Sequence, residues 1–310
     1  MEGNDTTKNQ KGSGISMEEQ IIAIFCEIDD FCNEYEEYCC HNSLPETTGP
    51  SKKSRLALSE IMTIIVYFHL SHYRTFKWYY KNYVSEHLRG YFPNLVSYTR
   101  FVELMQQSSV PLLLYLMTHC LGKCSGISFI DSTPLEVCDS HRIYSHKVFA
   151  GAARRGKSST GWFFGFKLHL VINDIGEILG FRLTPGNVSD ANMEVVNKIT
   201  ANLFGKLFGD KGYISQSLFS RLWEKNIQLI TKVKKNMKNK LMKLEDKLLL
   251  RKRALIESVN DFLKNICQIE HSRHRSVSNF LVNVFSALIA YSYILKKPSL
   301  NLRNNLLLPS

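Results

Sequence analysis

The sequence predicts an α/β protein in which a helical N-terminal part precedes a mixed sheet of five strands. Three observations support this class. Residues 54–121 carry apolar side chains at helical spacing, residues 126–231 contain short apolar or alternating runs typical of strands, and residues 248–266 return to helical spacing. A chain of 310 residues can bury one large core, or a moderate core beside a helical accessory domain.

The N-terminal part begins with a leader that we expect to be disordered, because residues 1–16 are rich in Lys, Gly, Ser, Thr and Asn. Residues 17–38 have the apolar spacing of a helix with acidic residues on its other face, and residues 44–53 contain the prolines and glycine of a linker. Further helices are expected near residues 59–68, 76–89, 97–107 and 111–121. Between residues 74 and 100, Lys and Arg alternate with Tyr and Trp, which indicates either a DNA-binding helical module or ordinary aromatic packing.

Five runs after residue 126 predict the strands of the sheet. They are residues 127–130, 166–172, 178–183, 203–209 and 227–231. The second and third are joined by a tight turn and form a hairpin, and helices are expected before the fourth, before the fifth and after the fifth. This order of strand, hairpin, helix, strand, helix, strand and helix is that of the RNase H-like (retroviral-integrase-like) fold.

The charge of the chain suggests a polyanionic partner, with nucleic acid the first candidate. The formal net charge is +11, and the sequence pI is about 9.2. Residues 17–46 hold nine acidic and no basic residues, whereas residues 47–310 hold 37 Lys or Arg against 17 Asp or Glu. A basic body of this kind attracts phosphate at long range.

The eight cysteines show no disulfide spacing, so reduced thiols in the cytoplasm are the simplest interpretation. A zinc site is an alternative, because five possible ligands cluster in the sequence: Cys26, Cys32, Cys39, Cys40 and His41. They lack the paired Cys-x-x-Cys spacing that is typical of zinc sites. No signal peptide and no membrane span are expected. The most apolar stretch, 280–295, is slightly short for a bilayer, and three polar residues interrupt it, so it predicts a buried or dimer-forming helix.

Two aspartates stand where apolar strands end, Asp131 after the first strand and Asp210 after the fourth. These strands should be neighbours, so the two carboxylates should converge. Mg²⁺ prefers hard oxygen ligands, and two such ions about 4 Å apart activate a nucleophile and stabilise a leaving oxygen in phosphodiester chemistry. Other aspartates fit less well: Asp174 lies in the hairpin turn, Asp190 resembles a helix cap, and Asp139 has no preceding strand.

A third carboxylate is expected on the last catalytic helix, in the pattern Arg253-x₃-Glu257-x₆-Lys264. Helical geometry places all three side chains within about 40° of one face, over a length of about 16 Å. A carboxylate between two cations suits a metal ligand with phosphate contacts on both sides. The alternative is a solvated salt-bridge face, and Glu270 is a weaker candidate for the same role.

The pattern around Glu257 resembles the signature of bacterial insertion-sequence DDE transposases, although Leu250 stands where that signature has Tyr. Four strings make the resemblance more specific and are similar to the insertion-sequence family numbered 982. They are Trp162-Phe-Phe-Gly-Phe-Lys-Leu-His169, Leu183-Thr-Pro-Gly-Asn-Val188, Gly209-Asp-Lys-Gly-Tyr213 and Glu270-His-Ser-Arg-His-Arg275. The resemblance covers about residues 50–300.

The resemblance implies that Asp131, Asp210 and Glu257 are the catalytic, metal-binding triad for two Mg²⁺ (or Mn²⁺) ions, and that Arg253 and Lys264 hold phosphates of the element's ends. It also implies that the N-terminal helices recognise terminal inverted repeats in a homodimer that joins two ends to target DNA. We therefore expect a bacterial, cytoplasmic, nucleoid-associated enzyme. Its expected parts are a leader (1–16), an end-binding domain (17–125), a catalytic domain (126–300, with a basic insertion at 232–247) and a tail (301–310).

Further DNA contacts are expected from two basic segments. Between residues 232 and 253 there are ten Lys or Arg, which indicates a DNA track; its first members are Lys232, Lys234, Lys235, Lys238 and Lys240. Arg154, Arg155 and Lys157 lie in an expected loop before the hairpin and should contact the DNA backbone. His141 and His146 are interpreted as phosphate-proximal loop histidines and not as metal ligands.

The leading hypothesis is a transposase that cleaves DNA at element ends and transfers the strands into target DNA. Two alternatives stay open at this point. One is a nuclease or resolvase of the same fold without joining activity, and the other is a catalytically inactive copy that acts as a DNA-binding repressor.

Overall fold

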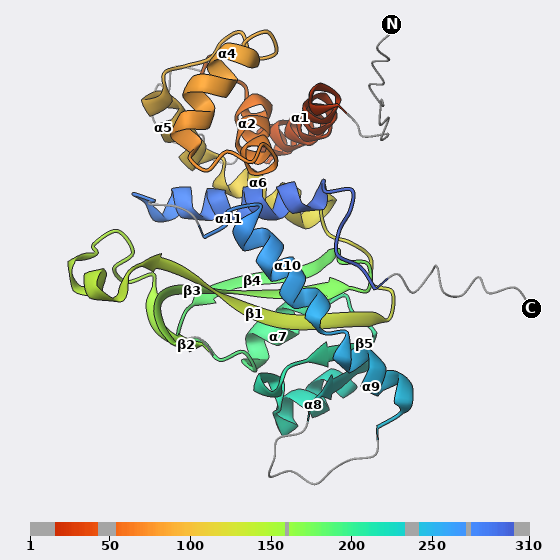
Figure 1. Cartoon of the computed structure of the whole chain (residues 1–310). Coiled ribbons are helices and arrows are strands. Elements are labelled where there is room, and N and C mark those ends of the chain that lie inside the picture. The colour runs from red at the N-terminus through yellow and green to blue at the C-terminus, as the bar shows by residue number, and fades with distance from the viewer. Residues whose placement is uncertain (1–15, 43–53, 159–160, 233–241, 271–273, 301–310) are drawn as a thin grey trace, which may run out of the picture.

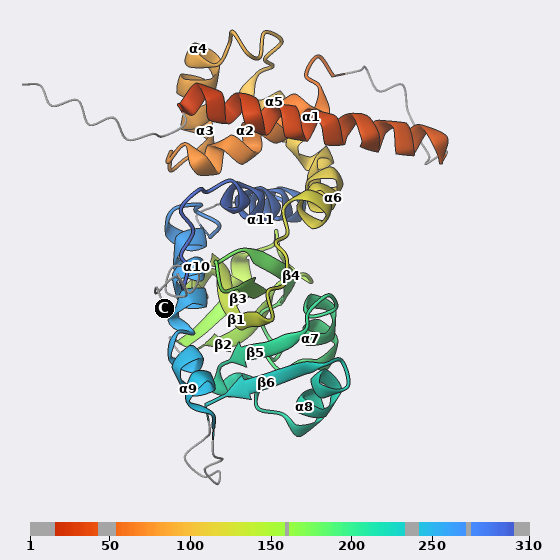
Figure 2. The same ribbon diagram turned by 90° about the vertical axis from the view of Figure 1, so that its right-hand side faces the viewer.

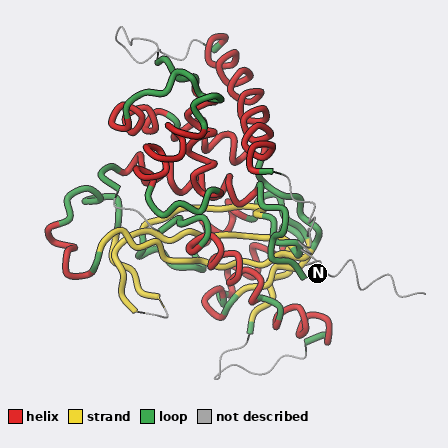
Figure 3. The backbone as a smooth tube through the Cα atoms, turned by 45° about the horizontal axis from the view of Figure 1, so that its top comes forward, coloured by secondary structure: helices red, strands yellow, loops and turns green. Residues whose placement is uncertain are grey.

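The computed structural model describes residues 16–42, 54–158, 161–232, 242–270 and 274–300. The leader and the tail expected at the two ends, apart from Ser16, lie outside these residues. Helices gather at one end of the molecule and a curled sheet at the other, as Figures 1 and 3 show. The helices before the sheet are α1 (Met17–His41), α2 (Leu58–Leu70), α3 (Phe76–Trp78), the π-helix η1 (Tyr79–Val84), α4 (Ser85–His87), α5 (Tyr98–Gln107) and α6 (Ser109–His119).

Aromatic side chains form the centre of this helical layer. Tyr79 and Tyr80 of η1 are fully buried, and Phe76 and Phe101 pack against them with ring centroids 4.6–6.3 Å apart. The aromatic residues of the segment 74–100 therefore pack internally for the most part, although Trp78 is half exposed. The sequence allowed this packing as the alternative to DNA contact.

The sheet has six strands among the described residues, and not the expected five. They are β1 (Ile127–Cys138), β2 (Arg154–Ser158), β3 (Gly161–Asn173), β4 (Ile178–Pro185), β5 (Gly205–Gly209) and β6 (Ile227–Thr231). Their order is β2-β3-β1-β5-β6, with β4 also paired to β3; β1 is antiparallel to β3, whereas β5 is parallel to β1 and to β6. The additional strand is β2, whose basic residues we expected in a loop but which pairs with the first half of β3.

The remaining helices follow β1 in the chain, and the longer ones pack on the two faces of the sheet. They are η2 (Ser140–Ser145), α7 (Met193–Ile199), η3 (Lys211–Tyr213), α8 (Gln216–Trp223), α9 (Leu244–Arg251), α10 (Ala254–Asn265) and α11 (Val277–Ser292). Side chains alternate along a strand. Accordingly, Phe129 and Phe208 join the core beneath α10 and α11, whereas Ile130 and Leu207 join a smaller core with α7 and α8.

The helix expected over residues 248–266 is two helices. α9 ends at Arg251 and α10 begins at Ala254, so that Lys252 and Arg253 form a turn between them. Arg253 consequently precedes α10 and does not lie within it. The residues at the break are good helix formers, so the break is set by packing: α9 contacts β5 and β6, and α10 contacts β1.

α11 lies between the helical layer and the sheet (Figure 2). It contacts α2, α5 and α6 on one side, while Phe280 stacks on Phe166 of β3 with 4.8 Å between ring centroids. Its residues from Phe280 to Tyr291 are nearly all buried, which confirms the expected buried helix. No helix among the described residues is long and apolar enough to cross a bilayer.

Candidate active site

Asp131 on β1 and Asp210, the first residue after β5, follow neighbouring parallel strands at the same level. The parallel pairing of β1 with β5 ends at Phe129 opposite Phe208, and each aspartate follows its phenylalanine by two residues. The two phenylalanine rings stack with centroids 5.5 Å apart, and alternation puts both aspartates on the same face as these rings. Convergence of the two carboxylates, expected from the strand ends, is thus supported by the register of the sheet.

β1 does not end at Asp131, contrary to the expectation of a short strand. Its antiparallel pairing with β3 continues as far as Cys138, with Asp131 opposite Leu170. Thr133 and Leu135 are buried on the same side of the sheet as Asp131. The second half of the strand is therefore marked by alternating burial and not by an unbroken apolar run. Asp131 therefore stands on a backbone held by β3, at the point where β5 leaves the sheet.

α10 brings the third expected carboxylate to this face. Ile256, Val259 and Leu263 are fully buried and fix the helix against β1. Glu257 lies in the first turn with a half-exposed side chain, and the buried Asn260 lies three residues later. Residues three apart share a helix face. The amide nitrogen of Asn260 donates to Oδ2 of Asp131 at 3.3 Å, so this face of α10 reaches the β1 aspartate.

Arg253 stands between Asp131 and Glu257. Its Nη1 lies 3.8 Å from Oδ1 of Asp131, and its Nη2 pairs with Glu257. The side chain of Arg253 is 15% exposed, which is little for a residue expected to hold DNA phosphate. Its position follows from the turn between α9 and α10, which directs the side chain back toward the sheet.

The pKa of Asp131 is raised to about 6. Burial is the largest cause, and the negative charges of Glu257 and Asp210 raise it further, while Arg253 and the backbone N–H of Ser132 lower it. The site thus carries more negative charge than its single nearby guanidinium compensates. Buried carboxylates with this surplus are typical of positions that bind a cation or exchange protons.

These residues fit the ligand chemistry of a hard divalent cation. Three carboxylates and one amide oxygen reach one face of the sheet, and the oxygen of Asn260 is buried without a hydrogen-bond partner among the described residues. No group of three or more His, Cys, Asp or Glu side chains in the described part of the chain lies close enough to hold a single metal ion. The described residues therefore offer hard oxygen donors on one face, but not a closed set of three acidic ligands around one ion.

Lys264 and Glu270 lie at a second position along β1. Lys264 Nζ is 2.9 Å from Oε2 of Glu270, and Oε1 of Glu270 accepts the backbone N–H of Glu136 at 2.8 Å. Glu136 is five residues beyond Asp131 on β1, so Glu270 belongs to the far half of that strand. The structure does not bring Glu270, the weaker candidate for the third ligand, together with Asp131.

The expected basic residues before the hairpin lie on strand β2, with Arg154, Arg155 and Lys157 all exposed. Trp162 of β3 faces Lys157 across the hairpin and is 56% exposed. The guanidinium of Arg155 lies 4.9 Å from its ring centroid and Nζ of Lys157 lies 5.7 Å from it. An exposed indole between two cations is a surface suited to nucleic acid. Trp162 was singled out in the sequence only within the string that resembles the insertion-sequence family.

The remaining expected residues are placed as follows. Lys232 is exposed just after β6, whereas Lys234, Lys235, Lys238 and Lys240 lie outside the described residues. In the cysteine cluster considered for zinc, Cys32 is buried with its Sγ 3.8 Å from Sδ of Met62, and Cys26 and Cys40 are exposed. Within the described ranges these residues form no metal-binding group.

Asp190 is not a helix cap, because the side chain of Asn192 caps α7. Its Oδ1 instead accepts hydrogen bonds from Ser132 at 2.6 Å and from Nζ of Lys167 at 2.9 Å. This cluster supports β1 from the face opposite Asp131. Tyr213 is buried nearby; burial and the charges of Asp131 and Asp190 raise its pKa well above the ordinary value, so it remains a neutral phenol.

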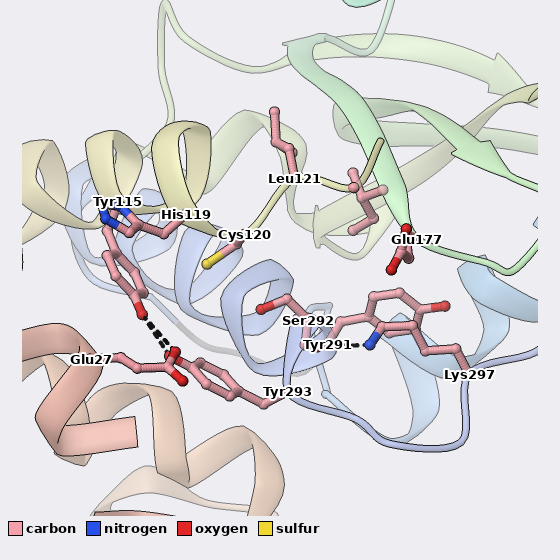
Figure 4. A pocket seen from close by; sticks show the side chains of 12 residues that line it. Glu27, Tyr115, His119, Cys120, Leu121, Glu177, Tyr291, Ser292, Tyr293 and Lys297 are labelled. Atoms are coloured by element: carbon pink, nitrogen blue, oxygen red, sulfur yellow. Dashed lines mark hydrogen bonds between the residues drawn. The ribbon is translucent and has the colours of Figure 1, made fainter. Parts of the chain in front are cut away.

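A cavity of about 300 Å³ lies apart from this acidic site, between α1, α6, the start of β4 and the end of α11. Figure 4 shows Tyr115 and Tyr293 converging on Glu27 of α1. The two hydroxyls are 2.5 Å apart, and that of Tyr293 donates to Glu27 at 2.8 Å. This cluster ties α1 to the rest of the molecule.

A comparison with protein families identifies the part of the chain that contains the acidic site. The family model described as a transposase DDE domain matches residues 121–277, just over half of the chain. Asp131, Asp210 and Glu257 all lie in the matched range, as does all of the sheet. No curated protein matches the chain. Domains of this family generally use divalent metals, act on DNA and are nucleases or strand transferases. The chain therefore belongs to the transposase DDE domain family.

Proposed function

We propose that this transposase cleaves DNA at the ends of an insertion sequence and joins those ends to target DNA, with Asp131, Asp210 and Glu257 as its catalytic carboxylates. The observation that carries the proposal is the level placement of Asp131 and Asp210 on one face of the sheet, beside the helix that carries Glu257. The four strings similar to the insertion-sequence family numbered 982 support membership of that family.

The sheet supports an RNase H-like fold for residues 126–300. When β2 is left aside, the order β4-β3-β1-β5-β6 has an antiparallel hairpin beside β1 and two parallel strands on its other side. This is the arrangement that the order of runs in the sequence led us to expect. We propose that the helices of residues 17–125 form the part that binds DNA ends.

Two Mg²⁺ (or Mn²⁺) ions would be held by Asp131 with Asp210 and by Asp131 with Glu257. When bound, they would activate water first and the released 3′-hydroxyl second, and stabilise the leaving oxygen. The chain's own contribution is rigid positioning: β3 and β5 hold the aspartates, and the buried face of α10 holds Glu257. Arg253 and Lys264 would exchange their carboxylate partners for DNA phosphates.

DNA would run from the acidic site across the exposed basic side chains. Of the basic residues that we expect to contact DNA, the structure describes Arg154, Arg155, Lys157 and Lys232. The further lysines expected in the same track are Lys234, Lys235, Lys238 and Lys240. We further propose that two copies of the chain bring two terminal inverted repeats together in the DNA complex.

The test compares Asp131→Asn, Asp210→Asn and Glu257→Gln with wild type on DNA that carries the element's end. Each substitution keeps the side chain's size and removes its charge. We expect loss of cleavage and joining with Mg²⁺ or Mn²⁺, and unchanged binding of the end. Asp261→Asn, an exposed carboxylate on the same helix, is the matched control and should keep full activity.

The products distinguish the alternatives. Joined products from the wild type support a transposase, whereas metal-dependent nicking without joining indicates a nuclease. End binding without any metal-dependent nicking indicates a repressor. Full strand transfer by any of the three triad variants would remove that residue from the proposed set.

A further inference from the structure

Asn260 is buried beside Asp131, in the interior of α10. It is 7% exposed, and its neighbours on the packed face of the helix, Ile256, Val259 and Leu263, are fully buried and apolar. Its amide nitrogen donates to Oδ2 of Asp131 at 3.3 Å. One half of the amide is therefore accounted for by a proposed catalytic carboxylate.

The other half of the amide has no partner. Oδ1 of Asn260 is shielded from solvent and accepts no hydrogen bond from the described residues. An amide oxygen can accept two hydrogen bonds, and leaving a buried acceptor unsatisfied costs about 1–3 kcal/mol. Buried polar atoms in folded proteins are nearly always paired, so this one requires an explanation.

Helix stability and packing do not explain the residue. Asn has a lower helix propensity than Leu or Ala because its side chain competes for backbone hydrogen bonds. At a position lined by Ile256, Val259 and Leu263, an apolar side chain would fill the space without burying an unpaired oxygen. The hydrogen bond to Asp131 explains the amide nitrogen, but the buried oxygen is explained only if it has a ligand.

We propose that Asn260 supplies this oxygen as a fourth protein ligand to the divalent cation bound by Asp131 and Glu257. The inference rests on the proposed function, since it assumes that those carboxylates hold metal. Glu257 and Asn260, three residues apart on one helix face, would then act with Asp131 from the facing strand. The amide adds a hard donor without adding negative charge to a site that already carries a surplus.

The experiment measures Mn²⁺ binding to the full chain without DNA, by electron paramagnetic resonance of the free ion and by calorimetry. The variants are Asn260→Leu, which removes the oxygen, and Asn260→Asp, which keeps an oxygen donor. Asn279→Leu is the matched control, because Asn279 of α11 is also buried with an unpaired Oδ1 but is not part of the acidic site.

We expect Asn260→Leu to weaken Mn²⁺ binding by about 10- to 100-fold, the effect typical of losing a supporting group at a metal site. Asn260→Asp should bind within a few-fold of wild type, and Asn279→Leu should bind like wild type. In EDTA, thermal unfolding of Asn260→Leu should occur at or above the wild-type temperature, because a buried orphan atom is removed.

Wild-type Mn²⁺ affinity in Asn260→Leu would overturn the inference. A lower unfolding temperature of the same variant in EDTA would then show that the role of Asn260 is purely structural. Asp131→Asn and Asp210→Asn are measured in parallel. If they also bind Mn²⁺ like wild type, the proposed two-metal function fails; if they lose binding while Asn260→Leu does not, only the role of Asn260 fails.

Discussion

Arg253 Nη1 lies 3.8 Å from Oδ1 of Asp131, and the same guanidinium pairs with Glu257. One cation thus stands against two carboxylates that come from a strand and a helix. Its attraction lowers the pKa of Asp131, but burial outweighs it and the pKa remains raised to about 6. The ionised form of Asp131 is therefore costly in the folded protein in the absence of a further cation.

The first prediction concerns the pH dependence of stability. Between pH 4 and 6 the folded state keeps the Asp131 proton that the unfolded state releases, so this residue makes the free energy of unfolding fall as pH rises through that window. Well above pH 6 Asp131 is ionised in the folded state, and its raised pKa then lowers the free energy of unfolding by about 3 kcal/mol. Asp131→Asn should therefore be more stable than wild type at pH 7.5 by up to that amount.

The measurement is chemical denaturation of both proteins in EDTA from pH 4.5 to 7.5. Only the difference between the two proteins is used, because three histidines titrate in both. His69 and His169 are buried and His274 is half-buried, and burial lowers the pKa of each to about 4. A difference that does not grow between pH 4.5 and 6.5 would contradict the assigned shift.

The second prediction concerns the indole of Trp162. Stacking of a nucleobase on an exposed aromatic side chain contributes about 1–3 kcal/mol. Trp162→Ala should weaken binding of DNA with an unpaired overhang by that amount, and blunt duplex by less, in fluorescence anisotropy. Trp223→Ala is the control, since Trp223 is 60% exposed but stacks on Phe219 of α8. Equal losses in the two variants would argue against a specific contact.

The third prediction concerns the ion pair between Lys167 and Asp190. The side chain of Lys167 is 11% exposed and that of Asp190 is 34% exposed. Removal of the Asp190 carboxylate therefore leaves the more buried charge, that of Lys167, without its partner. Asp190→Asn should destabilise the fold more than Lys167→Met, which should cost about 1–3 kcal/mol. Urea denaturation of the two single variants and the double variant gives the coupling energy, and a coupling near zero would mean that the pair contributes nothing.

The fourth prediction concerns Leu250, where the signature of insertion-sequence transposases has Tyr. Leu250 is 6% exposed and belongs to the main core, so a larger ring would overpack the core at a cost of about 1–3 kcal/mol. Leu248→Tyr on the same helix is the control, because Leu248 is 50% exposed and should change stability by less than about 0.5 kcal/mol. An unchanged unfolding midpoint in Leu250→Tyr would show that the ring turns outward.

The aspartates could be predicted from the sequence because both follow apolar runs, and parallel register then places them level. Strand β2 could not be predicted in this way, because Arg154, Arg155 and Lys157 show no strand-like alternation. These residues pair with the part of β3 that extends beyond its pairing with β4. The break between α9 and α10 at Lys252 and Arg253 could not be predicted from the sequence either, because contacts of the two helices with different strands set it.

Asn260 carries a sequence signal that we did not use: it follows Glu257 by three residues, and residues at that spacing share a helix face. Asp190 was misjudged because a local cap and a long-range ion pair look alike in sequence. Only the fold brings Lys167 of β3 and Ser132 of β1 to its carboxylate.

The position of α11 has a consequence for how the chain is made. α2, α5 and α6 are synthesised early, but they pack against a helix encoded by residues 277–292. During translation these helices must wait, with part of their apolar surface uncovered, until the whole sheet and α10 have emerged from the ribosome. A nascent chain that stops before α11 lacks the helix between the helical layer and the sheet, so apolar surface on both sides stays exposed and we expect proteases to degrade such fragments.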